Sequence, residues 1–236
     1  MTDRNQALLA AYEEIGRLLR ILAGDQVSSY QRLVDQLSPK VYAVRRNAPF
    51  LMQLADIRHV LAHPADARVG HPFEISERLI AHAQEIAQKL HKVPRAKDLG
   101  TSTADLFVAA RSDGVQSIIR VMRDRRFSHV PILAANKVEG VFSENTLFEY
   151  LYAEEIASLD EKTTVADVFA HCEIGDRRLE RYQFTHPTRF YEEVVKMFTE
   201  GLGASERVGA VFVTDTGNPG DRLQRMITAW DVLGTS

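Results

Sequence analysis

The spacing of large apolar residues changes once along this chain, and the change limits how it can fold. In the N-terminal part they recur every three or four positions, the pattern of amphipathic helices. In the rest, short apolar runs alternate with helical stretches. Residues 93–102 (VPRAKDLGTS) lie between these parts and contain proline, glycine and several charges, which is typical of a linker. The sequence therefore predicts a helical domain over residues 1–92 and a mixed domain of helices and strands over residues 103–236.

The N-terminal domain is predicted to contain four helices. In the first, Leu8, Tyr12, Ile15 and Leu19 lie on one face. The third ends at His63, because the residue before a proline avoids the α region. Four short helices make a small bundle with a thin core, so we expect a homodimer formed through a helix face. The predicted helices cover about residues 5–23, 28–37, 49–62 and 77–91.

Composition restricts the partners and the location of the chain. Its 236 residues include 29 basic and 32 acidic side chains, so the net charge of −3 creates no overall field that attracts nucleic acid or a membrane. The N-terminal residues lack the apolar core of a signal peptide, and no run of about 18 apolar residues occurs. We therefore expect a cytoplasmic protein without membrane contact.

Cysteine and histidine usage argues against a metal site. The single cysteine, Cys172, excludes an internal disulfide and a cysteine-based zinc framework, and we expect it to be structural. Four histidines in and near the N-terminal helices have irregular spacing, which does not predict a set of metal ligands. They are His59, His63, His71 and His82.

An arginine and a histidine lie five residues apart where the third helix is predicted to end, at Arg58 and His63. This Arg-x4-His pattern resembles the motif of the HEPN superfamily, many of whose members are dimeric, metal-independent ribonucleases. The resemblance implies that His63 acts as a general acid or base and that Arg58 holds a phosphate. The motif is short, however, and the alternative is that both residues serve helix capping and dimer contacts.

Residues 103–236 contain two units with the same predicted order of strand, helix, strand, strand and helix. The units cover about residues 103–155 and 160–236. The first strand of each is predicted over residues 106–109 and 182–185. The charged run 176–181 (DRRLER) is predicted to be a solvated loop or helix end.

Each unit has a hydroxyl residue where its last strand meets its last helix. In the second unit Thr228 is followed by Asp231, a spacing close to that of a capping box. The same arrangement suits a nucleotide, because a helix N-terminus offers free N–H groups to phosphate. In the first unit Ser143 keeps the hydroxyl, but Thr146 replaces the carboxylate. Trp230 either packs the final helix or stacks on a base.

These repeats resemble cystathionine β-synthase (CBS) domains, which occur in pairs and pack into one disc. Members of that family end each repeat with a small residue, apolar residues, Thr or Ser, two variable positions, and then Asp or Asn. The resemblance covers about residues 103–236. It implies an α+β fold class, with a four-helix-type HEPN-like bundle followed by a CBS-domain pair of two β-α-β-β-α repeats.

The resemblance also implies a cleft for an adenosyl ligand in the second repeat. Asp231 would accept hydrogen bonds from the ribose hydroxyls, and Thr228 would hold phosphate. Thr185, at the end of the first strand of the repeat, would border the base and phosphate.

The first repeat is implied to contribute less. Ser128 and His129 would reach a phosphate from the partner repeat. Ser143 would mark a second cleft that is empty or binds weakly, because Thr146 cannot replace a carboxylate as a bidentate acceptor.

The function implied is that of a regulatory, ligand-sensing protein without catalysis of its own. It would require no cofactor, and an adenine nucleotide (AMP, ADP or ATP) or S-adenosylmethionine would be its regulatory ligand. One alternative is a HEPN-type ribonuclease gated by the CBS pair, with RNA as a partner. Another is an interaction scaffold with an empty ligand site.

Overall fold

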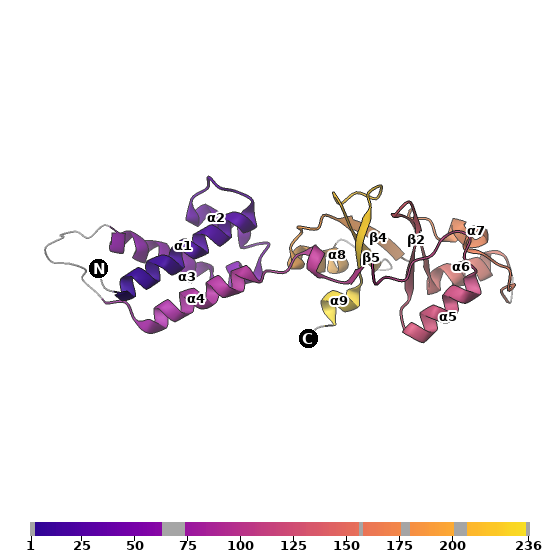
Figure 1. Ribbon diagram of the computed structural model, residues 1–236, viewed down its shortest axis with the longest axis horizontal. Helices are drawn as coiled ribbons and strands as arrows, with labels where there is room; N and C mark the ends of the chain where they lie inside the picture. Colours follow the sequence, from indigo (N-terminus) through magenta and orange to yellow (C-terminus); the bar gives the residue numbers. More distant parts are fainter. Residues whose placement is uncertain (1–2, 63–73, 156–157, 176–179, 201–206, 235–236) are drawn as a thin grey trace. The chain divides into compact units, whose positions relative to one another are not determined.

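A computed structural model describes residues 3–62, 74–155, 158–175, 180–200 and 207–234 (Figure 1). The chain divides into two compact units, Met1–Pro94 and Arg95–Ser236. The boundary falls inside the segment 93–102 that the sequence predicts as a linker. Residues after Pro94 belong to the second unit, where they form a short 3-10 helix and the first strand.

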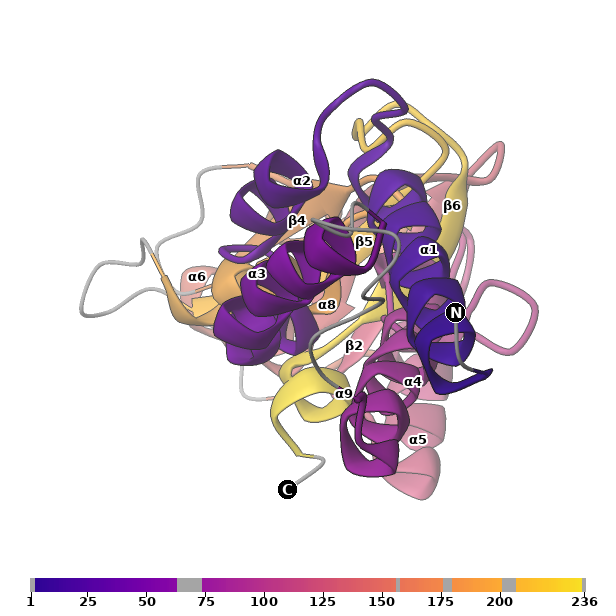
Figure 2. The same cartoon turned by 90° about the vertical axis from the view of Figure 1, so that its left-hand side faces the viewer.

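The regular structure of the described residues of the N-terminal unit is helical. Helix α1 packs against the other three, and the four lie side by side in two views (Figures 1 and 2). Their apolar faces meet in a core whose fully buried members include Leu8, Ile15, Leu19, Leu33, Leu51, Leu54 and Ile86. The helices are α1 (Asp3–Ala23), α2 (Tyr30–Leu37), α3 (Tyr42–Ala62) and α4 (Glu77–His91).

The starts of two helices show where local sequence decides the structure and where packing does. Helix α4 begins after Ser76, whose side chain accepts a hydrogen bond from the Leu79 amide at 3.3 Å, a normal N-cap. Helix α3 begins at Tyr42, two turns before the predicted start at Pro49. Val44, on those additional turns, is fully buried. Burial of this face therefore outweighs the hydrogen bond that Pro49 cannot donate.

The C-terminal unit is built on two sheets with helices packed around them. The larger sheet has the order β1-β6-β5-β4, in which β4 is parallel to β5 and the other neighbours are antiparallel; β2 and β3 form a separate antiparallel pair. The strands are β1 (Thr101–Ser102), β2 (His129–Ala134), β3 (Lys137–Ser143), β4 (Glu180–Thr185), β5 (Arg207–Thr214) and β6 (Leu223–Ile227). The helices are η1 (Ala96–Asp98), α5 (Val115–Arg125), α6 (Glu144–Ala153), α7 (Val165–Val168), η2 (Phe169–His171), α8 (Tyr191–Thr199) and α9 (Ala229–Leu233).

The first predicted strand of this unit, residues 106–109, is not a regular strand. It makes only an isolated bridge between Ala109 and Ile132. Strand β1, just upstream, instead pairs with β6 from the end of the chain. The guanidinium of Arg225 reinforces this pairing by donating to the carbonyls of Leu99 at 2.7 Å and Gly100 at 2.8 Å. The first residues of this unit are therefore held by hydrogen bonds to β6, the strand that ends just before Thr228.

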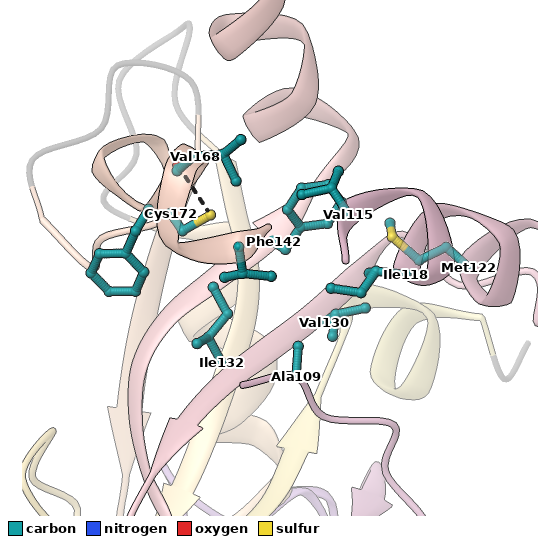
Figure 3. Close-up of a cluster of buried hydrophobic side chains, with 11 residues drawn as sticks. Ala109, Val115, Ile118, Met122, Val130, Ile132, Phe142, Val168 and Cys172 are labelled. Carbon is teal, nitrogen blue, oxygen red and sulfur yellow. Dashed lines mark hydrogen bonds between the residues drawn. The ribbon is translucent and has the colours of Figure 1, made fainter. Parts of the chain in front are cut away.

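A buried apolar cluster holds β2 and β3 against α5 and the α7–η2 segment (Figure 3). Ile118 of α5 and Val130 of β2 point toward each other in this cluster, beside Phe142 of β3. Cys172 is fully buried here, and its thiol contacts the Val168 carbonyl at 3.6 Å. The cysteine is thus part of the packed core, as the sequence predicts.

Gly100 is expected to be essential for the junction between β1 and β6. Its φ is +63°, and a Cβ atom there would overlap the Met226 carbonyl oxygen and lie 2.9 Å from Ile227 Cα. We expect Gly100→Ala to lower the free energy of unfolding by more than about 1 kcal/mol, measured by urea denaturation with circular dichroism. Gly220→Ala is the matched control, because a Cβ at Gly220 meets nothing within 4 Å. If both variants lose the same free energy of unfolding, glycine is not specifically required at position 100.

Candidate functional site

The two strand-to-helix junctions of the C-terminal unit line the same cleft, whose volume is about 870 Å³. Ser143 lies at the end of β3 and Thr228 at the end of β6. The starts of β2, β4 and β5 and the C-terminal part of α5 also line the cleft. The sequence predicted a separate second cleft at Ser143. The structure instead brings Ser143 into the cleft of Thr228.

Four of the six predicted ligand-binding residues line this cleft: Ser128, His129, Ser143 and Thr228. Thr185 does not, because it lies at the opposite end of β4 from the cleft-lining Glu180. Five residues of strand separate these two positions by roughly 16 Å. Asp231 is also not part of the cleft lining, although its neighbour Trp230 is.

Thr228 and Asp231 form a complete capping box. Asp231 Oδ2 accepts hydrogen bonds from the Thr228 amide at 2.7 Å and from the Thr228 hydroxyl at 2.8 Å. Because the hydroxyl proton is donated to Asp231, Thr228 Oγ1 can only accept a hydrogen bond from a ligand. Thr164 and Asp167 form the same box at α7, at 2.8 and 2.7 Å, but do not line the cleft.

A buried carboxylate, that of Glu180, lies in the cleft wall. Its side chain is only 3% exposed. Oε1 interacts with His129 Nε2 at 2.9 Å, and Oε2 accepts from the Ser143 hydroxyl at 3.1 Å and the Tyr182 hydroxyl at 2.8 Å. Burial by itself raises the pKa of Glu180, but the hydrogen bond and charge of His129, with the hydroxyls of Tyr182 and Ser143, lower it to about 2. Glu180 is therefore ionised at neutral pH.

The sequence predicted the charged run 176–181 to be solvated, and for Glu180 this is wrong. Glu180 is the first residue of β4 and is buried against β5. Gly209 of β5 makes the room: a Cβ atom there would lie 2.7 Å from Glu180 Cγ and 2.9 Å from Oε1. A glycine inside an apolar strand is a sign of such a close approach. That signal was present in the sequence.

Glu180 also changes the interpretation of the first junction. Thr146 is fully buried and completes a capping box with Ser143, so it faces the helix rather than the cleft. The carboxylate that the first repeat lacks at Thr146 is nevertheless present beside Ser143. It comes from β4, 37 residues along the chain.

Three arginines that the sequence did not single out line the cleft and are exposed: Arg123, Arg126 and Arg207. Arg123 pairs with its neighbour Asp124 at 3.0 Å, and Arg207 lies 3.8 Å from Glu180. No described acidic residue pairs with Arg126. The cleft thus has a cationic rim around a wall that contains a buried anion.

Trp230 also lines the cleft, and the residue is 84% exposed. It therefore does not pack the final helix, which was one of the two interpretations of the sequence.

Of the predicted Arg-x4-His pair, the structure describes only the arginine. Arg58 is exposed, and its guanidinium lies 6.0 Å from the Tyr12 ring centroid. Together with Arg20 it lines a pocket of about 400 Å³ in the N-terminal unit. His63 lies outside the described residues, as does His71.

Two other classes of site can be assessed from the described residues. Among them, no three His, Cys, Asp or Glu side chains are grouped in a way that could hold a metal ion. None of the helices that they form combines the length and apolar character needed to cross a membrane.

Comparison with known proteins identifies part of the C-terminal unit. Residues 96–153 match the CBS domain family. The chain contains a CBS domain. The match begins immediately after the boundary at Pro94 and ends with α6. It confirms the family resemblance over the first of the two predicted repeats.

Several solved structures are similar to this chain at low sequence identity. The crystal structure of CBSX2 in complex with AMP is 16% identical, with a TM-score of 0.42, covering 59% of this chain and 93% of that one. A putative acetoin utilization protein (AcuB) from Vibrio cholerae is 22% identical, with a TM-score of 0.41, covering 60% and 89%. Hypoxic Response Protein I with two coordinated zinc ions is 14% identical, with a TM-score of 0.43, covering 61% and 99%. No curated protein matches the sequence.

The pKa of Glu180 predicts a pH-dependent contribution to stability. Because this pKa falls from its ordinary value of 4.5 to about 2 on folding, the ionised carboxylate stabilises the fold above about pH 4.5. The contribution is lost as the pH falls toward 2. We expect Glu180→Gln to be less stable than wild type by about 1–3 kcal/mol at pH 7, with the difference closing over that range.

Urea denaturation at a series of pH values, followed by circular dichroism, measures this difference. Glu144→Gln is the control, since Glu144 also lines the cleft but is exposed, and its effect should be small at every pH. A stability difference for Glu180→Gln that stays constant down to pH 2 would show that the charge of Glu180 is not responsible.

Proposed function

We propose that this protein is a regulatory sensor whose CBS-containing unit binds an adenosyl nucleotide and performs no chemistry on it. The observation that carries the proposal is the cleft shared by Ser143 and Thr228. Its volume of about 870 Å³ lies in the range of small-molecule sites, roughly 300–1,000 Å³. The family match at residues 96–153 supports an adenine nucleotide as the ligand, and no cofactor is required.

The chemistry of the cleft suits the parts of a nucleotide. The exposed guanidinium groups of Arg126 and Arg207 can donate paired hydrogen bonds to a phosphate. Thr228 Oγ1 can accept from a ribose hydroxyl, because its own proton is donated to Asp231. The exposed indole of Trp230 offers a flat apolar face to an adenine ring.

Within this proposal Asp231 acts mainly as a positioning residue. Its Oδ2 orients the hydroxyl and amide of Thr228, and the start of α9 with them. Direct acceptance of ribose hydroxyls by Asp231 would use Oδ1, to which no described residue donates. Both roles make ligand affinity depend on Asp231.

Asp231→Ala tests this dependence against a matched control, Asp167→Ala. Each variant removes one carboxylate from an equivalent capping box, so each should lose about 1 kcal/mol of stability. Only Asp231→Ala should also weaken nucleotide binding, by about tenfold or more. Isothermal titration with adenosine, AMP, ATP and S-adenosylmethionine measures the affinity.

Thermal shift provides a second measurement, since a ligand at about 100 times its dissociation constant stabilises by about 2.7 kcal/mol. Asp231→Ala binding as tightly as wild type would remove Asp231 from the site. Binding of none of these ligands by wild type would refute nucleotide sensing and favour the scaffold alternative.

The pocket beside Arg58 supports a second candidate function for the N-terminal unit, namely a HEPN-like dimeric ribonuclease. Arg58 and Arg20 both line this pocket, and neither is paired with a described acidic residue. Two such guanidinium groups form a suitable subsite for the RNA backbone phosphate. His63 would supply the general acid or base, and the CBS-containing unit would gate the activity.

RNA cleavage by wild type and by His63→Ala tests this second candidate. We expect the variant to lose at least about 100-fold in rate, the usual contribution of a positioned acid or base. His91→Ala is the control, because His91 is an exposed histidine at the end of α4 and lies outside the motif. Equal cleavage by wild type and His63→Ala would reject the role of His63, and a monomer by light scattering would reject the shared dimer cleft.

A further inference from the structure

The cleft has two sides with opposite chemistry. On the side formed by the first repeat, the hydroxyl of Ser143 and the imidazole of His129 are already hydrogen-bonded to a carboxylate of the protein. The Ser143 hydroxyl donates to Glu180 Oε2 at 3.1 Å, and His129 Nε2 lies 2.9 Å from Glu180 Oε1. Ser128 Oγ in turn forms a hydrogen bond with His129 Nδ1 at 2.8 Å. The hydrogen-bonding groups on this side therefore point toward a carboxylate of the protein itself.

The position of Glu180 makes its charge effective within the cleft. With 3% of the side chain exposed, little water is present to screen it. The hydroxyls of Tyr182 and Ser143 hold it in place by hydrogen bonds of 2.8 and 3.1 Å, in space that the missing side chain of Gly209 leaves open. A phosphate placed at Ser143 would face this fixed anion, and the Ser143 hydroxyl and the His129 imidazole are already hydrogen-bonded to that anion.

The rim of the cleft, by contrast, favours an anionic group. Arg123, Arg126 and Arg207 are exposed and line the cleft from α5, its C-cap and β5. Arg126 has no described acidic partner, and Arg207 lies 3.8 Å from Glu180 on its solvent side. An anionic group of a ligand is therefore favoured at the rim and disfavoured at Ser143.

We infer that Glu180 is a specificity-determining residue that excludes anionic groups from the Ser143 side of the cleft. That side accepts a neutral hydrogen-bond donor or a cationic group, while a single anionic group binds at the arginine rim. The ligand class selected is an adenosyl compound with one phosphate or with a cationic tail, in preference to a triphosphate. The identity of the adenosyl part rests on the proposed function; the exclusion of anions does not.

Affinities of wild type, Glu180→Gln and Glu144→Gln for adenosine, AMP, ATP and inorganic triphosphate test this inference. Wild type should bind AMP more tightly than ATP. Glu180→Gln should gain at least about tenfold in affinity for ATP and for inorganic triphosphate, because a like charge is removed. Its affinity for adenosine should change by less than about threefold. Glu144→Gln removes an exposed carboxylate from the same cleft and should change every affinity by less than about threefold.

The inference is overturned if Glu180→Gln leaves the ratio of triphosphate to adenosine affinity unchanged, or if it binds inorganic triphosphate no better than wild type does. Inorganic triphosphate lacks adenine, so this arm tests Glu180 even if no adenosyl ligand binds. Failure of wild type to bind adenosine and AMP refutes only the proposed function. If Glu180→Gln does not fold, the wild-type affinities decide: ATP binding as tightly as AMP would overturn the inference.

Discussion

The hydrogen bonds of the Glu180 carboxylate are the interaction on which the wall of the cleft depends. They join β4 to the ends of β2 and β3, which come from the other half of the same unit. A buried charge is tolerated only when it is well paired, so His129, Ser143 and Tyr182 must all remain in place around it. The same carboxylate joins the Ser143 junction to β4 and places a negative charge in the cleft wall.

Local features of this chain could be predicted from its sequence. Helix α4 has the predicted bounds because its apolar spacing and its Ser76 cap act within a few residues. Thr228 and Ser143 are found at strand-to-helix junctions because a capping box is also a local structure. In each of these two capping boxes, the hydrogen bonds join residues only three positions apart.

Features that depend on distant partners could not be predicted in the same way. Glu180 lies in a run of charges with the composition of a solvated loop, and its partner His129 is 51 residues away. The early turns of α3 form because tertiary packing buries Val44, which outweighs the proline that marks a helix start in the sequence. Strand β1 pairs with β6, more than 120 residues away, whereas the apolar run 106–109 makes only one bridge.

The position of Trp230 gives this protein a built-in optical probe. It is the only tryptophan in the chain, and its exposed indole lies on the cleft lining. Light at wavelengths absorbed by tryptophan but not by tyrosine therefore excites a fluorophore at one place in the molecule. Contact with an aromatic base, or transfer of the indole out of water, would change its emission. Occupancy of the cleft can thus be followed without a label.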